Sequence, residues 1–195
     1  MCEIETPRLR LRQFTFDDVD DLYCIYSHPD LIKYLSNDKP FQKEHTRAAI
    51  NSLVKNWQQY RFGIWAVVYK THEKLIGHCG LRFLENTREI QLSYLLLPSY
   101  WGRGLGTEAA SSVLSYAFEV VCLDRIVAIA KPENMASRRV MEKVGMKYQE
   151  DAYYYDNHVV YYSISRDAYR YRNRGFKHTT NNGTLVGARE ALAKR

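Results

Sequence analysis

The sequence predicts an α+β fold, with a mixed, mostly antiparallel twisted sheet of about seven strands flanked by about four helices. Three observations carry this prediction. Three apolar, β-branched segments follow one another between residues 62 and 97, as in consecutive antiparallel strands. A glycine-rich turn then leads into an amphipathic helix. A further apolar strand follows that helix, which predicts a strand–helix–strand crossover between parallel neighbours.

The first 60 residues predict one strand and three helical stretches. Residues 8–14 alternate polar and apolar side chains, which is typical of a half-buried strand with an arginine face. Thr15 and Asp18 resemble a capping box, so a helix is expected to begin there. The helical stretches are expected over residues 16–27, 28–35 and 44–60.

The middle of the chain predicts three antiparallel strands and the crossover. The strands are expected over residues 62–69, 75–84 and 89–97. Apolar residues then recur at i, i+4 from Ala109 to Val121, as on one face of a helix, and residues 125–130 supply the next strand.

The last part predicts a short helix and a hairpin. The helix runs from Met135 to Val144 and ends at Gly145, and residues 153–155 and 158–164 form the hairpin. The boundary of the domain is expected at Tyr169. Residues 1–169 then form one domain, and residues 170–195 form a basic, flexible tail.

The charge of the chain is concentrated at this tail. The formal net charge is +6, yet residues 170–195 hold seven of the 28 Lys and Arg and one of the 22 acids. The rest of the chain is therefore neutral overall. A basic tail without clear periodicity is more typical of a solvated segment than of a specific reader of nucleic acid, although a ribosome or RNA contact stays an alternative.

Cysteine usage and hydropathy exclude other classes. The four cysteines show no CxxC or Cys/His spacing, so no metal site is expected, and a reduced cytoplasmic protein is the simple interpretation. The N-terminal residues lack the pattern of a secretion signal, and no run approaches the roughly 20 apolar residues of a membrane span. Secretion and membrane insertion are therefore disfavoured.

The most informative segment is the turn that contains Gly102, Gly104 and Gly106. It joins an apolar strand directly to a helix start. Glycine lets the main chain turn sharply and aim several N–H groups at one anion at the positive end of the helix. The segment therefore predicts a phosphate cradle.

With these elements in order, four segments carry a resemblance to a known family. They are Thr-Pro-Arg-Leu-Arg-Leu-Arg at 6–12, Leu-Ile-Gly-His-Cys-Gly-Leu at 75–81, Tyr-Trp-Gly-Arg-Gly-Leu-Gly-Thr-Glu-Ala at 100–109, and Asn-Met-Ala-Ser-Arg-Arg-Val-Met-Glu-Lys-Val-Gly-Met at 134–146. The chain resembles the GNAT superfamily of N-acetyltransferases, and most closely its RimJ/RimL-like branch. The resemblance covers about residues 5–168.

The resemblance implies an acyl-CoA cleft between the strands at 92–97 and 125–130, splayed apart so that unpaired main-chain groups receive pantetheine. Acetyl-CoA would be the co-substrate and an amine the acceptor. The implied contacts are Leu95, Leu96 and Leu97 to acetyl and pantetheine, Arg103, Gly104, Leu105, Gly106 and Thr107 to the diphosphate, and Asn134 and Ser137 to the pantetheine arm. The amides of pantetheine can hydrogen bond to a strand edge, and a diphosphate can bind at the start of a helix.

Catalytic candidates follow from two departures from the family pattern. Met141 stands where many members carry a tyrosine acid, and a thioether cannot donate a proton. Ser137 is therefore the candidate for hydrogen bonding to the departing thiolate, with Tyr148 in reserve. Gln91 stands where the related family often has Glu, so Glu89, on the same face of the strand, is the candidate base. A third departure is Trp101, which stands in place of Gln or Arg. It leaves the main-chain donors of the cradle intact.

Three hypotheses on function stay open at this stage. The leading one is an acetyl-CoA-dependent N-acetyltransferase that acts on a protein N-terminus or a small amine by direct attack in a ternary complex. The second is a non-catalytic acyl-CoA-binding module, motivated by Gln91 and Met141. The third is ribosome or RNA association through the basic tail. A tyrosine-rich last hairpin suits a homodimer contact or an acceptor groove equally.

A route through an acetyl-cysteine intermediate is disfavoured. His78 and Cys79 are adjacent on a predicted strand, so their side chains point to opposite faces and cannot share a proton directly.

Overall fold

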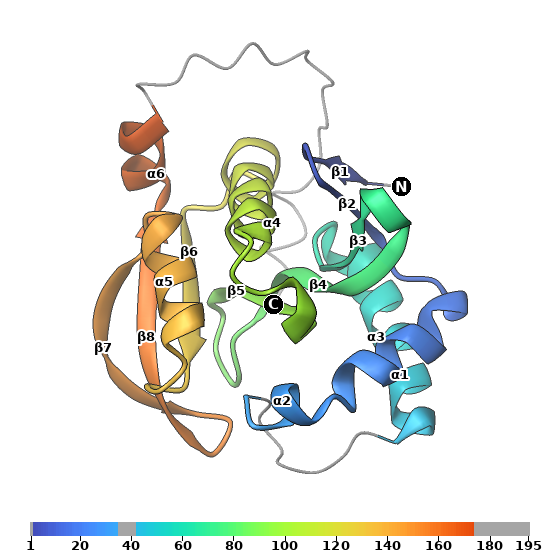
Figure 1. Cartoon of the computed structure of the whole chain (residues 1–195). Coiled ribbons are helices and arrows are strands. Elements are labelled where there is room, and N and C mark those ends of the chain that lie inside the picture. Colours follow the sequence, from blue (N-terminus) through green and yellow to red (C-terminus); the bar gives the residue numbers. More distant parts are fainter. Residues whose placement is uncertain (1, 35–41, 174–195) are drawn as a thin grey trace.

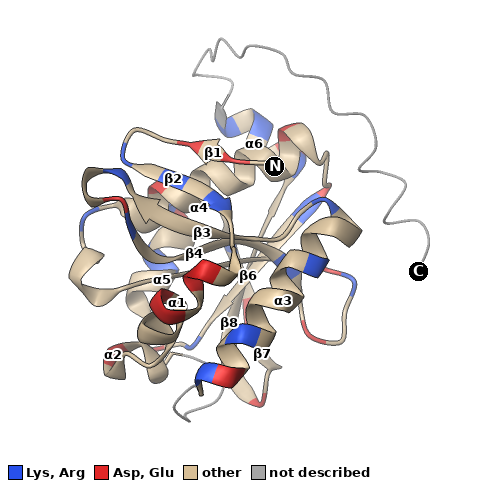
Figure 2. Ribbon diagram, turned by 90° about the vertical axis from the view of Figure 1, so that its right-hand side faces the viewer, with Lys and Arg blue, Asp and Glu red and all other residues tan. Residues whose placement is uncertain are grey.

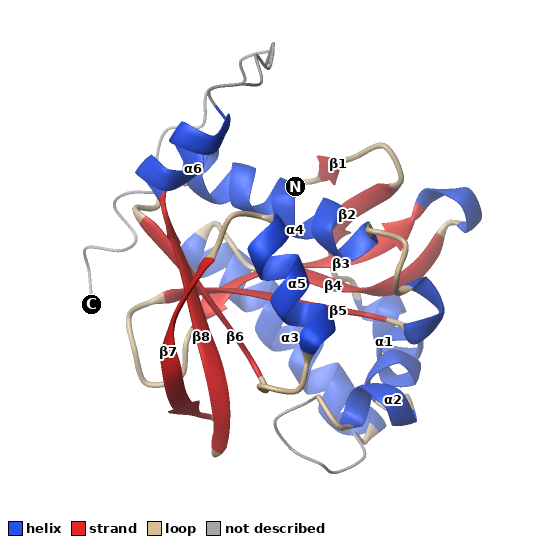
Figure 3. Ribbon diagram, turned by 60° about the vertical axis from the view of Figure 1, so that its left-hand side comes forward, coloured by secondary structure: helices blue, strands red, loops and turns tan. Residues whose placement is uncertain are grey.

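The computed structural model describes residues 2–34 and 42–173, and these form one eight-stranded sheet with helices on both faces (Figures 1 and 3). The strand order is β1-β2-β3-β4-β5-β6-β8-β7. The strands are β1 (Ile4–Glu5), β2 (Leu9–Gln13), β3 (Ile64–Tyr69), β4 (Lys74–Phe83), β5 (Ile90–Leu96), β6 (Arg125–Ala130), β7 (Lys147–Tyr154) and β8 (Asn157–Ser165). The predicted fold class is confirmed, with one strand more than expected.

The helices are close to those predicted, with α6 (Arg166–Asn173) as an addition. They are α1 (Val19–Tyr26), α2 (Pro29–Ile32), α3 (Lys43–Tyr60), α4 (Leu105–Ser115), α5 (Met135–Lys143) and α6 (Arg166–Asn173). A short 3-10 turn precedes α1, where Asp18 accepts a hydrogen bond from the main-chain N–H of Thr15 at 2.8 Å, as the capping box predicts. The acidic side chains that follow cluster on α1 (Figure 2), in the first turn that favours negative charge.

The helix after the glycine turn changes its winding before it ends. Residues Tyr116–Val120 form a π-helical turn, in which the N–H of Val121 donates to the carbonyl of Tyr116 at 3.0 Å. The hydroxyl of Tyr116 donates to the carbonyl of Arg61 at 2.8 Å, which ties this turn to the end of α3. The predicted helix to Val121 is therefore present, in two geometries.

The C-terminal elements differ from the prediction. Strand β7 begins at Lys147 rather than at Tyr153, and α6 runs across the expected boundary at Tyr169 to Asn173. Tyr169 is buried, and its ring lies 4.9 Å from that of Phe118. The first residues of the expected tail are thus helical, and residues 174–195 lie outside the described part of the chain.

The sheet has a weak point at its centre. Strands β5 and β6 are parallel, as predicted, but their register contains the single pair Gln91↔Val127. The neighbouring pairs are long antiparallel ladders, β4 with β5 over seven residue pairs and β6 with β8 over six. Beyond Gln91 the two strands separate, which is the splayed pair that the cleft requires.

Two larger clusters of buried residues fill the two sides of the sheet. One joins residues of α4 and α5 to β5, including Leu105, Met141 and Leu96. The other joins α1 and α3 to β3 and β4, including Leu22, Ile50 and Ile64. In the part of the chain that the structure describes, no helix has the length and apolar character that crossing a membrane requires.

Candidate active site

The glycine turn forms an N–H cradle at the start of α4. Gly102 has φ 72° and Gly104 has φ 76°, the left-handed region that favours glycine. Gly104 precedes Leu105, so the N–H groups of the first helical turn have no carbonyl partner inside the helix. This arrangement can bind an anion. Five residues predicted to hold the diphosphate, Arg103, Gly104, Leu105, Gly106 and Thr107, lie together here.

The N-terminal segment fixes this cradle from the side. Arg8 donates from Nη1 to the carbonyl of Arg103 at 2.8 Å and from Nε to Glu108 at 2.7 Å. The hydroxyl of Thr6 donates to the other carboxylate oxygen of Glu108 at 2.6 Å. These roles were not predicted, although Thr6 and Glu108 lie in two of the segments that carry the family resemblance. The cradle is therefore held by groups about 100 residues away.

The edge of β5 that faces β6 offers main-chain groups to a ligand. The N–H of Leu97 donates to the carbonyl of Ile76 at 2.8 Å, so Leu97 and, two residues back, Leu95 direct their main chain toward β4. Tyr94 and Leu96 direct theirs into the gap beside β6. Of the three predicted leucines, only Leu96 thus presents main-chain groups to the cleft.

Trp101 forms a hydrogen bond with one of these main-chain groups, the carbonyl of Leu96. Its indole N–H donates to the carbonyl of Leu96 at 2.6 Å, and its ring lies 6.1 Å from that of Tyr34. The tryptophan that replaces the usual Gln or Arg therefore fastens the turn to the end of β5. The side chain of Arg103 lies with its guanidinium 5.5 Å from the Tyr100 ring, at the exposed rim of the cradle.

The side chains of β5 alternate between two chemically different faces. Leu96 is 6% exposed and packs in the cluster with α4 and α5, and Tyr94 lies against the same cluster. Leu95 packs toward α1 and α3. We call the side that carries Gln91, Ser93 and Leu95 the acceptor face, because the helices of the cradle cover the other side.

A tyrosine–serine pair lies on the cradle side of the cleft. The Tyr94 hydroxyl donates to the carbonyl of Ser137 at 2.9 Å and is 2.9 Å from the Ser137 hydroxyl. Burial raises the pKa of Tyr94, so its phenol keeps the proton at neutral pH. Asn134, predicted beside Ser137, begins α5 by accepting a hydrogen bond from the Ser137 N–H at 3.0 Å. Tyr94 was missed, although it shares the strand face of Leu92 and Leu96.

The other catalytic candidates lie apart from this pair. Glu89 accepts hydrogen bonds of 2.7 Å from the Tyr161 hydroxyl to both oxygens and lies 3.3 Å from Arg125. Six residues of extended strand, about 20 Å, separate it from Leu95. Tyr148 is 48% exposed on β7, and its hydroxyl donates to Asp151 at 3.1 Å. Both side chains are thus bonded to partners other than Ser137, and their catalytic roles stay predictions.

His78 and Cys79 face opposite sides of β4. Nδ1 of His78 lies 3.2 Å from the Tyr26 hydroxyl on α1, whereas Cys79 is buried in the cluster with α4. Burial raises the pKa of the Cys79 thiol, so the thiol stays protonated and is a poor nucleophile. Burial, with a smaller effect of Arg82, lowers the pKa of His78 from 6.5 to about 3. A neutral imidazole therefore lies on the acceptor face.

This buried imidazole makes the stability of the protein depend on pH. The folded pKa of His78 is below the unfolded value, so between pH 6.5 and about 3 the unfolded chain binds a proton that the folded chain does not. The free energy of unfolding should fall as the pH falls through this window, by about 1.4 kcal/mol per pH unit. Denaturant titrations at pH 7.5 and 5.0 measure this loss. We expect the loss of unfolding free energy between these two pH values to be about 2 kcal/mol smaller in His78→Gln than in the parent protein. An equal loss in the variant and the parent would contradict a lowered pKa at His78.

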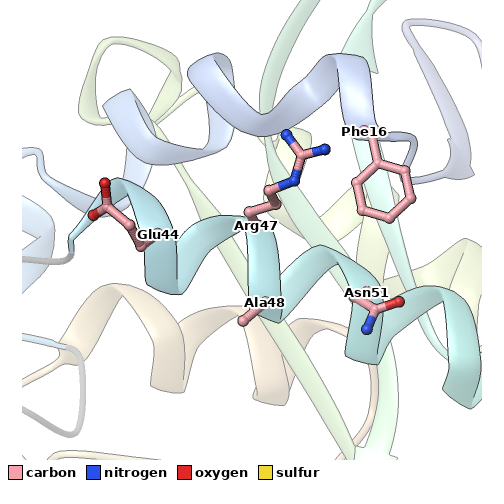
Figure 4. A pocket seen from close by; sticks show the side chains of 5 residues that line it. All are labelled: Phe16, Glu44, Arg47, Ala48 and Asn51. Carbon is pink, nitrogen blue, oxygen red and sulfur yellow. The ribbon is translucent and has the colours of Figure 1, made fainter.

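An open groove of about 380 Å³ lies elsewhere, between α3 and the turn before α1 (Figure 4). Phe16, Glu44, Arg47, Ala48 and Asn51 line it, and the Arg47 guanidinium lies 5.4 Å from the Phe16 ring. None of these residues belongs to the cradle or the cleft. Among the described residues, no group of three His, Cys, Asp or Glu side chains is arranged to hold a metal ion.

Comparison with known proteins agrees with this geometry. Residues 8–147 match the family model described as an acetyltransferase (GNAT) domain. The chain belongs to the GNAT acetyltransferase family. It is 35% identical over 146 residues to the uncharacterized N-acetyltransferase YnaD of Bacillus subtilis (strain 168), covering 74% of this chain and 82% of that protein.

Solved GNAT structures share the fold. The GNAT family acetyltransferase of Bacillus anthracis superposes with a TM-score of 0.72 and 28% identity, over 85% of this chain and 99% of that one. The ribosomal-protein-S5-alanine acetyltransferase of Vibrio fischeri superposes with a TM-score of 0.74 and 19% identity, over 86% and 98%. This GNAT protein is thus an N-acetyltransferase, and acetyl-CoA is its co-substrate.

The chain's own groups fit that co-substrate. The N–H cradle before α4 suits a diphosphate, and the main-chain groups of Tyr94 and the N–H of Leu96 suit the amides of pantetheine. When bound, acetyl-CoA supplies an activated acetyl group as a thioester. The contacts of all the predicted cofactor-binding residues stay predictions.

Proposed function

We propose that this enzyme transfers the acetyl group to a primary amine, either the α-amine of a protein or a small-molecule amine, by direct attack in a ternary complex. The observation that carries the proposal is the division of β5 into two faces at the point where it separates from β6. The proton donors Tyr94 and Ser137 lie on the face of the cradle. Ser93 and Leu95 lie on the other face, where an amine can approach.

In this proposal each group has one task. The Tyr94–Ser137 pair holds the proton that the departing sulfur takes up, because the phenol stays protonated and the two hydroxyls share a hydrogen bond. The main-chain N–H of Leu96 would donate a hydrogen bond to the carbonyl oxygen of a bound thioester. Glu89 is too distant along β5 to accept the amine proton directly. We therefore assign that proton to solvent on the acceptor face.

Membership of the RimJ/RimL-like branch is part of the proposal. The fold shared with the ribosomal-protein-S5-alanine acetyltransferase supports it. The four cysteines Cys2, Cys24, Cys79 and Cys122 are free, which supports a cytoplasmic location. Ribosome association through residues 174–195 concerns a segment outside the described residues.

A non-catalytic acyl-CoA-binding module is the second candidate. Gln91 cannot accept a proton at neutral pH, and Met141 is fully buried in the core. Mass spectrometry of a lysate supplied with labelled acetyl-CoA, with and without this protein, separates the two. We expect labelled amines that appear only with the active protein, and no acetyl-enzyme in the absence of an acceptor. Binding of acetyl-CoA without any labelled product would favour the second candidate.

A further inference from the structure

The acceptor face is open at the centre of the sheet. Ser93 and Leu95 are partly exposed, although β5 has strands on both sides. Across β4, Ser93 lies opposite Gly80, where the main chain of Gly63 and Ile64 approaches too closely for a side chain. A small part of this face is therefore accessible where β5 leaves β6.

A cationic side chain borders this opening on β4. Arg82 pairs with Gln91 in the β4–β5 register and shares the face of His78, four residues earlier on the strand. Its guanidinium lies 5.1 Å from the ring centre of Tyr155. Among the described residues, Arg82 makes no ion pair. The guanidinium is therefore placed by an aromatic ring and not neutralised by a carboxylate.

A second cation lies at the other end of the opening. Lys131 follows the last residue of β6, and its ammonium donates to the carbonyl of Lys33, just after α2, at 2.9 Å. The ammonium thus connects the end of β6 to the helices on the acceptor side.

The carboxylates on this face are engaged elsewhere. Glu85 accepts a hydrogen bond from the main-chain N–H of Tyr155. Glu89 accepts from Tyr161 and pairs with Arg125. Burial raises the pKa of Tyr26 and lowers the pKa of His78, and the charge of Arg82 adds a smaller, lowering contribution to both. Neither carboxylate forms an ion pair with Arg82, so the guanidinium is available to an anion at this face.

We propose that the acceptor amine carries a carboxylate a few bonds away, and that Arg82 binds this carboxylate. Arg82 and Ser93 are diagonal neighbours across β4 and β5, about 7–8 Å apart at their Cα atoms. An arginine side chain can therefore reach an anion within one or two residues of an amine that lies over Ser93. Free amino acids and peptides that begin with Asp or Glu share this chemistry, whereas polycationic amines do not fit it.

The inference rests on the proposed function and is tested on two peptides that differ in one charge, with free aspartate and spermidine beside them. The rate constant kcat/KM is measured for free aspartate, for an amidated peptide beginning with Asp, for the same peptide beginning with Asn, and for spermidine. We expect at least one of the two acidic acceptors to exceed the Asn peptide about tenfold, with spermidine the poorest. The relative rates of free aspartate and the Asp peptide distinguish the two sources of the carboxylate.

Arg82→Gln should remove this preference and leave the KM for acetyl-CoA unchanged. Arg82→Lys keeps the charge and should keep most of the preference, and it serves where the glutamine variant does not fold. Arg88→Gln, at an exposed arginine in the β4–β5 turn, is the matched control and should behave like the parent enzyme. If neither free aspartate nor the Asp peptide exceeds the Asn peptide, or if the preference survives Arg82→Gln, the inference is overturned and the proposed function stands. No product from any amine would overturn both.

Discussion

Replacing Gly104 by Asp is expected to raise the dissociation constant for acetyl-CoA about 100-fold while the protein stays folded. Asp is one of the few residues other than glycine that adopts the left-handed conformation found at Gly104, so the strain is smaller than for most other side chains. The new carboxylate would lie at the start of α4, where it interacts favourably with the helix. It would also repel the diphosphate from the same N–H groups. Calorimetric titration with acetyl-CoA measures the change.

The neutral variant Gly104→Asn is the control for this prediction. It has almost the same shape and the same backbone tolerance, but no charge. We expect its affinity for acetyl-CoA to stay within about fivefold of the parent, and thermal unfolding of both variants to stay close to it. Equal affinities of the Asp and Asn variants would show that the diphosphate does not bind at this helix start.

Replacing Tyr94 by Phe is expected to lower kcat about 100-fold with little change in the KM for acetyl-CoA. The substitution removes the hydroxyl that lies 2.9 Å from the Ser137 hydroxyl and leaves the ring in its packing. Release of free thiol at saturating acceptor measures the rate. Tyr148→Phe is the matched control, because Tyr148 is exposed and bonded to Asp151.

A double variant shows whether the two hydroxyls act as a unit. If they share one proton, Tyr94→Phe combined with Ser137→Ala should cost little more than the larger single effect. Independent, multiplying effects would mean that the hydroxyls have separate tasks. An unchanged kcat in Tyr94→Phe together with a loss in Tyr148→Phe would transfer the role to Tyr148.

The features that could be predicted from the sequence are those with a local physical signal. The glycine turn is required by positive φ at Gly102 and Gly104, and the helix after it has an apolar stripe of its own. The parallel pairing of β5 and β6 follows from the helical connection between them. Gly145 has φ 92°, as its place at the end of α5 predicts.

The elements that were missed have no such signal. Strand β7 lies at the edge of the sheet and is largely exposed, so the polar residues Lys147 to Asp151 show no hydrophobic period. Strand β1 has two residues and exists through its pairing with β2. The Tyr94–Ser137 pair joins residues 43 apart in sequence and depends on how α5 packs on the sheet. Glu89 was chosen for its chemistry, and its distance from Leu95 follows only from the length of the strand.

The lone residue pair between Gln91 and Val127 has a thermodynamic consequence. The sheet consists of two halves, each with regular hydrogen bonding between its strands. Where β5 and β6 separate, their main-chain N–H and C=O groups are left to bind the amides of a ligand. A ligand in that position connects the two halves of the sheet. Its binding stabilises the folded protein by about 2.7 kcal/mol when the free ligand concentration is about a hundred times the dissociation constant. The heat tolerance of this enzyme should therefore follow the supply of its acyl donor, so that its lifetime in a cell reports on the metabolic state.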